Sequence, residues 1–383
     1  MNKIKTAGTL TLLSIASLTI MVGCVIVPGL TSIASHLGVP HAAGWLVTLP
    51  SLGVVLFGPL AGLLIQRKGA YSCLTSGLIL YGVLGGGGVF LRGLPLFIDR
   101  LLLGGATAMI MASGTGLISV FFTGQERLTM IARQGMSIEL GGVIFLSIGG
   151  MLASRGWQWP FLLYLMAWVF GVMLLLFVPR PQSTQDGDGD KAADGAPGRL
   201  GKTMMATYMT ASLAMLVFFV GIIFIPGRLG ALDLSTSAIG FFMSFISLIA
   251  VVSASQMPRC VGKIGPFGTL VFAFCAYAGS HILFYLAASL PVYFAAAVLI
   301  GMGFGLSVPL VNHMAIEFSP ARVRGRNLAY LSVAIFGGQF MSGFMEFFHD
   351  PRLPFLGAFV LSVLAAIGLK CMGISSNKVH PHA

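Results

Sequence analysis

The sequence predicts an all-α membrane protein whose twelve transmembrane helices form two pseudo-symmetric bundles of six. Of its 383 residues, 56% are hydrophobic and only 9% are charged, which leaves too little polar surface to cover a soluble globule. Apolar runs of roughly 20 residues, the length that crosses the hydrocarbon of a bilayer as a helix, recur along the chain. Landmarks of the first half also return in the second half at a nearly constant separation, which indicates a duplicated unit.

Twelve apolar runs mark the expected helices. In chain order they are Ala7–Leu30, Ala43–Ile65, Cys73–Phe90, Leu94–Val120, Arg133–Ala153, Pro160–Val178, Met204–Pro226, Ser237–Gln256, Gly268–Ala288, Val292–Met314, Leu328–Phe348 and Pro354–Gly373. They predict an N-terminal six-helix bundle over residues 1–180 and a C-terminal one over residues 203–374. A polar, glycine-rich cytoplasmic linker at 181–202 joins the bundles, and a cytoplasmic tail at 375–383 follows.

The repeat supports the two bundles most directly. Separations of 194 to 198 residues relate Pro28 to Pro226, Gly69 to Gly265, Leu94-Pro95 to Leu290-Pro291, and Pro160-Phe161 to Pro354-Phe355. Four landmarks at almost one offset predict the same helix order in each half.

The positive charges are placed asymmetrically. The net charge is +11, yet with the N-terminus in the cytoplasm the outer loops hold only Arg92, Arg155, Arg228 and Arg352. Apart from Arg100, the other basic residues lie at the cytoplasmic ends, which is the positive-inside bias of membrane proteins. It predicts a multi-pass protein of the bacterial cytoplasmic (inner) membrane with both termini inside, and it explains the charge without nucleic acid.

The predicted helix 94–120 carries an acidic and a basic residue next to each other. A guanidinium within a membrane costs roughly 2.5–3.5 kcal/mol, so Arg100 is expected to face the bundle interior and find a partner. Asp99 points about 100° away on the helix and is not automatically that partner. The alternative places both residues near the outer headgroups, with Arg100 snorkelling.

Two further polar residues stand out in apolar helices. Glu139 shares a helical face with Gly135 and Gly142, and a carboxylate lodged there can take up a proton at modest cost, because burial disfavours its charge. The alternative has Glu139 reaching the cytoplasmic interface near Arg133. At 1.5 Å per residue, Arg100 and Glu139 should be roughly 10 Å or more apart in depth, so no bridge is expected. Gln339, near the middle of its helix, can bind substrate or hydrogen-bond across helices.

The loop after the second predicted helix resembles a known signature. Gly62, Leu64, Arg67 and Gly69 match the pattern G-x-L-a-D-r-x-G-r-k of the major facilitator superfamily, while Gln66 replaces the usual aspartate. In that family the loop locks the two halves together on the cytoplasmic side. The resemblance implies the major facilitator fold, with a substrate site near the midplane between the halves.

Two more stretches resemble the drug and metabolite:proton antiporter branch of that superfamily. Arg100 followed by Gly104 resembles the helix-4 motif R-x-x-q-G-x-g. Gly149-Gly150 and the segment WQWPF at 157–161 resemble the helix-5 region, where G-P-x-x-G-G precedes W-r-W-x-F, although Leu146 stands near the expected proline.

The resemblance implies a secondary active transporter. We expect it to export a small organic molecule or drug by alternating access in exchange for protons. Glu139 or Asp99 would carry the proton, and Arg100 and Gln339 would serve substrate binding or charge relay. The loop residues named above, Gly62, Gln66, Arg67 and Gly69, would form a cytoplasmic gate. The alternatives are proton-coupled uptake of a small organic anion, with Arg100 as its ligand, and a non-transporting membrane receptor or assembly partner.

Catalytic and cofactor motifs are missing from the sequence. It contains no GK[ST] phosphate loop, no metal-spaced set of histidines, cysteines and acids, and no nucleophile–base constellation. We therefore expect no catalytic residues, no metal and no cofactor, and a monomer whose partners are a small-molecule substrate, protons and the lipid bilayer.

Overall fold

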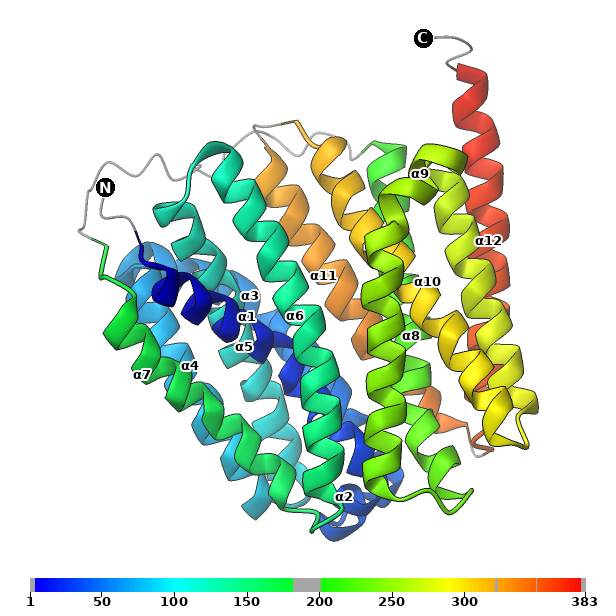
Figure 1. Ribbon diagram of the computed structural model, residues 1–383, viewed down its shortest axis with the longest axis horizontal. Coiled ribbons are helices and arrows are strands. Elements are labelled where there is room, and N and C mark those ends of the chain that lie inside the picture. The colour runs from blue at the N-terminus through cyan, green and yellow to red at the C-terminus, as the bar shows by residue number, and fades with distance from the viewer. Residues whose placement is uncertain (1–3, 182–200, 321–322, 349, 380–383) are drawn as a thin grey trace. The chain divides into compact units, whose positions relative to one another are not determined.

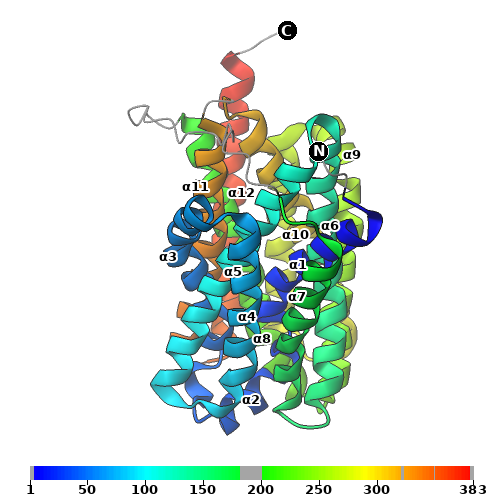
Figure 2. The same ribbon diagram turned by 90° about the vertical axis from the view of Figure 1, so that its left-hand side faces the viewer.

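The computed structural model describes residues 4–181, 201–320, 323–348 and 350–379, and the regular elements in these ranges are helices. Eleven of the described helices are long and apolar enough to cross a membrane. One of them, α9 (Thr236–Leu286), has 51 residues and turns at Gly265, so it supplies two spans (Figures 1 and 2). Counting α9 twice gives twelve spans, and the predicted all-helical fold is confirmed.

The first compact unit contains the elements from α1 to α7. The helices are α1 (Thr6–Cys24), α2 (Leu30–His36), α3 (Trp45–Lys68), α4 (Ala70–Gly87), α5 (Gly93–Phe121), α6 (Gly124–Ala153) and α7 (Met166–Phe177). Short 3₁₀ segments occupy Val27–Gly29, Pro40–Ala42, Gly88–Phe90 and Trp159–Leu165. The stretch Pro226–Ser244, at the end of α8 and the start of α9, clusters with this unit.

The second compact unit contains the rest of α8 (Lys202–Gly230) and α9, with α10 (Leu290–Glu317), α11 (Arg324–Ser342) and α12 (Leu353–Val379). A 3₁₀ segment, Gly343–Phe347, follows α11. Most of the linker predicted at 181–202 and the last residues of the predicted tail lie outside the described ranges.

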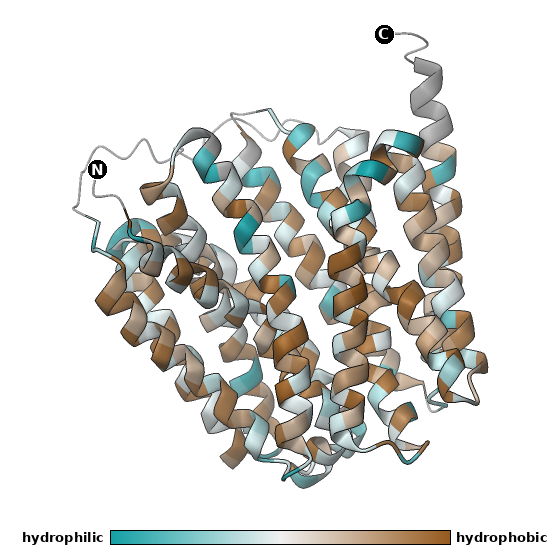
Figure 3. Ribbon diagram, viewed as in Figure 1, coloured by the Kyte–Doolittle hydropathy of each residue, from teal (hydrophilic) through white to brown (hydrophobic). Residues whose placement is uncertain are grey.

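Hydropathy varies along the helices as expected for a membrane protein. Figure 3 shows hydrophobic residues along most of the helix lengths and hydrophilic residues concentrated toward helix ends. Large apolar side chains such as Leu176 and Leu364 are exposed, which is costly in water and favourable in lipid. The bilayer therefore replaces water around the helix middles.

Glycines set the closest helix crossings. In the first unit α3 and α5 meet at Gly53 and Gly104, where a β-carbon on Gly104 would lie 2.8 Å from the Cα of Gly53. In the second unit Gly301, 197 residues after Gly104, lies against α9, and a β-carbon there would come within 2.7 Å of the backbone oxygen of Ile246. The repeat seen in the sequence is therefore a repeat of helix packing.

A second crossing follows the same rule. A β-carbon on Gly141 of α6 would lie 2.8 Å from the Cβ of Ser17 in α1. Gly338 of α11, also 197 residues later, packs on the backbone of Ser212 in α8. Each unit thus brings its first and fifth spans together through one glycine.

Several helix boundaries differ from the prediction, and two of them show why. The sequence predicts a first helix that continues to Leu30, but α1 ends at Cys24. The chain resumes as a 3₁₀ turn containing Pro28, whose ring nitrogen cannot donate a helical hydrogen bond. The fifth helix begins at Gly124, nine residues before the predicted Arg133. The polar residues Glu126 and Arg127 continue that helix beyond the apolar run, so hydropathy alone missed its start.

Candidate functional site

Asp99 and Arg100 form an ion pair inside the first unit. Nη2 of Arg100 lies 2.9 Å from Oδ2 of Asp99, and the two side chains are only 1% and 6% exposed. Although neighbouring helical positions point apart, the long arginine side chain folds back to reach the carboxylate. Arg100 therefore lies in the bundle interior, and its partner is the neighbour that sequence reasoning did not single out.

The glycine run 85–88 leaves room for this pair. Nη2 of Arg100 also donates a hydrogen bond to the backbone oxygen of Gly85 at 3.4 Å. A β-carbon at Gly88 would overlap Nη2 and lie 3.1 Å from Oδ2 of Asp99. The guanidinium thus occupies the space that a side chain at position 88 would fill.

Two aromatic rings also lie against the guanidinium. Cζ of Arg100 is 5.5 Å from the ring centres of Phe161 and Tyr164, a distance at which ring faces attract cations. Nε and Nη1 of Arg100 are buried and make no hydrogen bond with the described residues. The low exposure of both side chains shows that protein encloses the pair.

The aromatic lining is fixed to the first helix. The hydroxyl of Tyr164 donates to the backbone oxygen of Val22 at 2.9 Å, and the hydroxyl of Tyr81 donates to that of Leu18 at 2.7 Å. The two tyrosine rings lie 5.7 Å apart. A movement of α1 would therefore displace the Tyr164 ring, which lies against Arg100.

Glu139 has a different environment. It lies in α6, ten residues after Thr129 and fourteen before Ala153, the limits of that membrane span. The side chain is half-buried and has no hydrogen bond or ion pair with the described residues. At 1.5 Å per residue the nearer end of the span, at Thr129, is about 15 Å away, farther than a glutamate side chain reaches. Glu139 is thus deeper than the sequence suggested.

Gln339 lies in the second unit, in α11. Its side chain is buried, and the adjacent Gly338 packs on the backbone of α8 at Ser212. The position next to Gln339 therefore lies at the crossing of α8 and α11. The Asp99–Arg100 pair belongs to the first unit.

The loop between α3 and α4 is exposed. Gln66 and Arg67 lie exposed in the last turn of α3, and Arg67 forms no ion pair with any described residue. Gly62 has open space beside it. Gly69 follows with φ +80°, a conformation that L side chains rarely adopt. Gly265, its counterpart 196 residues later, has φ +72°. The glycine of the loop signature is therefore required by the turn itself.

The comparison with known families decides the class of the protein. The Major Facilitator Superfamily profile matches residues 10–343, which is most of the chain. The chain belongs to the Major Facilitator Superfamily. It is therefore a multi-pass membrane transporter, and the superfamily predicted from the loop signature is confirmed, whereas membership of the antiporter branch stays a prediction.

The chain is similar to relatives whose names point to different cargo. A putative tartrate transporter from Agrobacterium vitis is 24% identical over 305 residues, covering 72% of this chain and 68% of the relative. Multidrug resistance protein 1 from Bacillus subtilis (strain 168) is 24% identical over 172 residues, covering 43% of this chain and 44% of the relative.

Solved superfamily structures share the fold. The nucleoside transporter NupG matches with a TM-score of 0.77 and 14% identity over 95% of this chain and 99% of that one. The inward-open xylose transporter XylE from E. coli matches with a TM-score of 0.73 and 16% identity over 94% of each chain. At such identities the match establishes the architecture, not the cargo.

Sequence reasoning missed one polar residue in the second half of this transporter. His281 of α9 is fully buried, with Nε2 2.9 Å from the backbone oxygen of Val217 in α8 and Nδ1 without a hydrogen-bond partner among the described residues. Its ring lies 6.1 Å from Phe355, the repeat counterpart of Phe161. A lone histidine in the apolar run 268–288 was the signal that could have identified it.

Metal ligation has no visible basis in the described residues, which contain no group of three or more histidines, cysteines and acids able to hold an ion. Members of this superfamily act as transporters rather than as enzymes.

Proposed function

We propose that this transporter exports a small organic molecule in exchange for protons and that Glu139 carries the proton. One observation carries the proposal: Glu139 lies deep in a membrane span, half-buried, with no cation beside it among the described residues. An ionisable group within a membrane span is costly, and such groups typically mark ion pathways or proton relays. Protonation removes the charge and so alters how readily α6 is exposed to lipid or water.

Asp99 is the second candidate for the proton, and its pairing makes it the weaker one. The carboxylate already has a counter-charge in Arg100 at 2.9 Å, so protonation would leave a buried guanidinium uncompensated. We assign Arg100 to charge relay rather than to substrate binding, because its side chain is only 1% exposed and a substrate could not reach it in this state. Gln339, next to the crossing of α8 and α11, would bind substrate or tie these helices together.

We further propose that Gly62, Gln66, Arg67 and Gly69 gate the cytoplasmic side. Gln66 and Arg67 are exposed, and Arg67 has no ion pair with a described residue, so both side chains can contact another surface. The positive-inside bias supports an inner-membrane protein with both termini and the 181–202 linker in the cytoplasm. We expect the monomer to be the working unit.

The alternative transport function is proton-coupled uptake of a small organic anion. The relative named as a putative tartrate transporter favours it, because tartrate is a small organic anion. Arg100 would then be the ligand, which requires the enclosed guanidinium to become accessible in another state. The relative named multidrug resistance protein 1 favours export instead. A receptor that does not transport would tolerate neutralisation of Arg100, Asp99 and Glu139 together.

The test compares small molecules in medium and cytoplasm for cells that express the unaltered chain, Glu139→Gln, Glu126→Gln or nothing. Glu126 is an exposed glutamate at the start of the same helix and serves as the matched control. Export predicts solutes that are enriched outside by the unaltered chain and by Glu126→Gln but not by Glu139→Gln. Enrichment inside the cell would reverse the direction, and full activity of Glu139→Gln would eliminate its role as proton carrier.

A further inference from the structure

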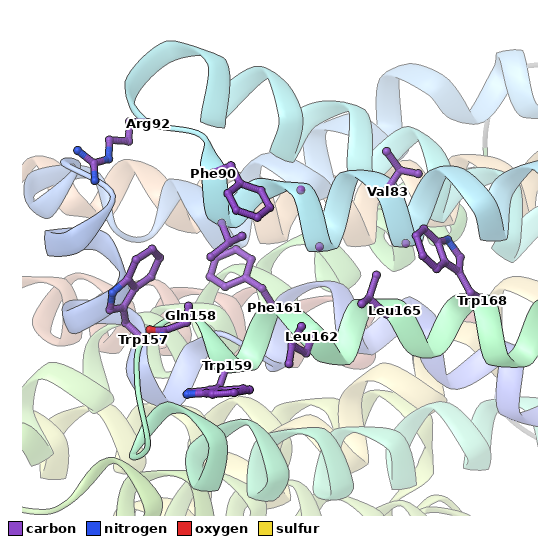
Figure 4. A pocket seen from close by; sticks show the side chains of 14 residues that line it. Val83, Phe90, Arg92, Trp157, Gln158, Trp159, Phe161, Leu162, Leu165 and Trp168 are labelled. Carbon is purple, nitrogen blue, oxygen red and sulfur yellow. The ribbon is translucent and has the colours of Figure 1, made fainter.

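The first unit contains a large groove that the proposed transport mechanism does not use. It has a volume of about 1000 Å³ and lies between the end of α4 and the segment that leads into α7 (Figure 4). That is near the upper limit of typical ligand pockets. Its lining, at the opposite end of the unit from Lys5, is Gly82, Val83, Gly86, Gly87, Val89, Phe90, Arg92, Trp157, Gln158, Trp159, Phe161, Leu162, Leu165 and Trp168.

Tryptophan is concentrated around this groove. Trp157, Trp159 and Trp168 are three of the four tryptophans in the chain. Trp159 and Trp168 are 42% and 45% exposed, and Phe90 is 87% exposed. Indole rings favour the boundary between hydrocarbon and headgroups. The groove therefore has the surface of a site that meets lipid at the membrane interface.

One wall of the groove has no side chains, because glycines form it. Gly86 and Gly87 both line it, and a β-carbon on Gly87 would have no heavy atom within 4 Å. The backbone at Gly87 has helical angles that any L residue adopts, so a glycine is not needed there for the chain conformation. The missing side chains leave an apolar trough beside Phe161 and Leu165.

A single positive charge lies at the rim. Arg92 is exposed, lines the groove and forms no ion pair with any described residue. Gln158 also lines the groove and has no charge, and none of the described lining residues is acidic. Apolar walls below one unpaired cation match a molecule that has an acyl chain and an anionic headgroup.

We propose that this groove binds an anionic phospholipid, with an acyl chain along Gly86 and Gly87 and the headgroup phosphate at Arg92. Phe161 gives such binding a consequence, because it lines the groove and also lies 5.5 Å from the guanidinium carbon of Arg100. A bound chain would restrain that ring. The lipid would thereby stabilise the enclosure of the Asp99–Arg100 pair.

The test uses the full chain in vesicles of a zwitterionic phospholipid to which an anionic phospholipid with brominated acyl chains is added as a minor component. Bromine quenches indole fluorescence on contact, so the tryptophans of the groove report on bound chains. One arginine near a membrane surface contributes about 1 kcal/mol, which predicts about fivefold preference over a brominated zwitterionic lipid.

Two pairs of variants separate this site from ordinary boundary lipid. Arg92→Gln should abolish the preference, whereas Arg352→Gln, at an exposed arginine of the second unit, should keep it. Gly87→Leu should fill the trough and reduce quenching, whereas Gly58→Leu, at another helical glycine with open space beside it, should not. Equal quenching by both brominated lipids in the unaltered chain, or a preference that survives Arg92→Gln, would overturn the proposal.

Discussion

Asp99 and Arg100 neutralise each other within α5, whereas Glu139 in α6 has no counter-charge among the described residues. The physical consequences differ. A paired charge resists protonation because its partner would be left alone, while a lone carboxylate in a membrane span gains from losing its charge. Asp99 and Glu139 are equal candidates for the proton carrier by sequence, but their environments favour Glu139.

The first residue-scale prediction concerns the ion pair. Asp99→Asn leaves a buried guanidinium uncompensated and is expected to cost about 3–5 kcal/mol of stability. The double variant Asp99→Asn, Arg100→Met removes both charges and should recover most of that loss. Thermal unfolding of the detergent-solubilised protein measures both. Asp233→Asn is the control, because Asp233 is exposed and its φ of 59° suits asparagine. Equal losses in the single and double variants would contradict the pairing argument.

The second prediction concerns two adjacent glycines. Gly88→Ala places a methyl group where Nη2 of Arg100 lies and is expected to cost about 1–3 kcal/mol. Gly87→Ala meets open space and should be neutral or stabilise the helix by up to about 1 kcal/mol. The same unfolding assay compares them. If both variants behave alike, the guanidinium does not occupy the place described here.

The sequence predicts which polar residues lie inside the bundle, but it does not predict which residues they pair with. An arginine in an apolar helix indicates burial, and the guanidinium of Arg100 is indeed buried. Its pairing with Asp99 depends on how a flexible side chain folds in the space left by Gly88, which helical spacing does not encode. The apolar run also places Glu139 too close to the end of its helix, because that helix starts at Gly124, before the run begins.

At the scale of elements, the turns after α3 and within α9 are equivalent. Gly69 and Gly265 both have positive φ and extended ψ, at 153° and 170°, a region that is essentially restricted to glycine. Gly69→Ala and Gly265→Ala are each expected to cost about 1–3 kcal/mol. The controls are Gly62→Ala and Gly262→Ala, two glycines with open space beside them and no positive φ.

These controls should instead gain up to about 1 kcal/mol, because alanine favours the helix. Unfolding midpoints of all four variants provide the measurement. A loss at Gly62 or Gly262 as large as at Gly69 would indicate that the backbone angle is not the cause.

Hydropathy predicts that each membrane-spanning helix exists, but it does not predict where the helix begins and ends. Hydropathy identifies every span because lipid contact requires a long apolar run. It does not detect the polar turns of α6 before Thr129, nor the continuation of α9 through Pro258 up to Gly265. Helical hydrogen bonds continue beyond the membrane wherever the backbone allows them, so the apolar run gives the minimum length of a helix.

At the scale of the whole molecule, the duplication extends from sequence to packing. The glycine crossings at Gly104 and Gly301 and at Gly141 and Gly338 have one offset of 197 residues. The buried polar group differs between the units, since Arg100 neighbours Phe161 in one and His281 neighbours Phe355 in the other. The sequence predicts the repeated scaffold because packing glycines and turn prolines recur. It does not predict function from that scaffold, because the polar residues have diverged between the halves.

The last prediction concerns the orientation of the whole molecule in the membrane. Basic residues gather at one end of the first unit, namely Lys5, Arg67, Lys68 and Arg180, whereas Arg92 lies at the other end. The positive-inside bias therefore predicts that the termini face the cytoplasm. Green fluorescent protein fused to the C-terminus should therefore fluoresce, and alkaline phosphatase fused there should be inactive. Phosphatase fused after Gly93 should be active, and the same enzyme fused after Gly69 should not. The reverse pattern would place Arg92 and its groove in the cytoplasmic leaflet and the α3–α4 loop outside, where it could not gate the cytoplasmic side.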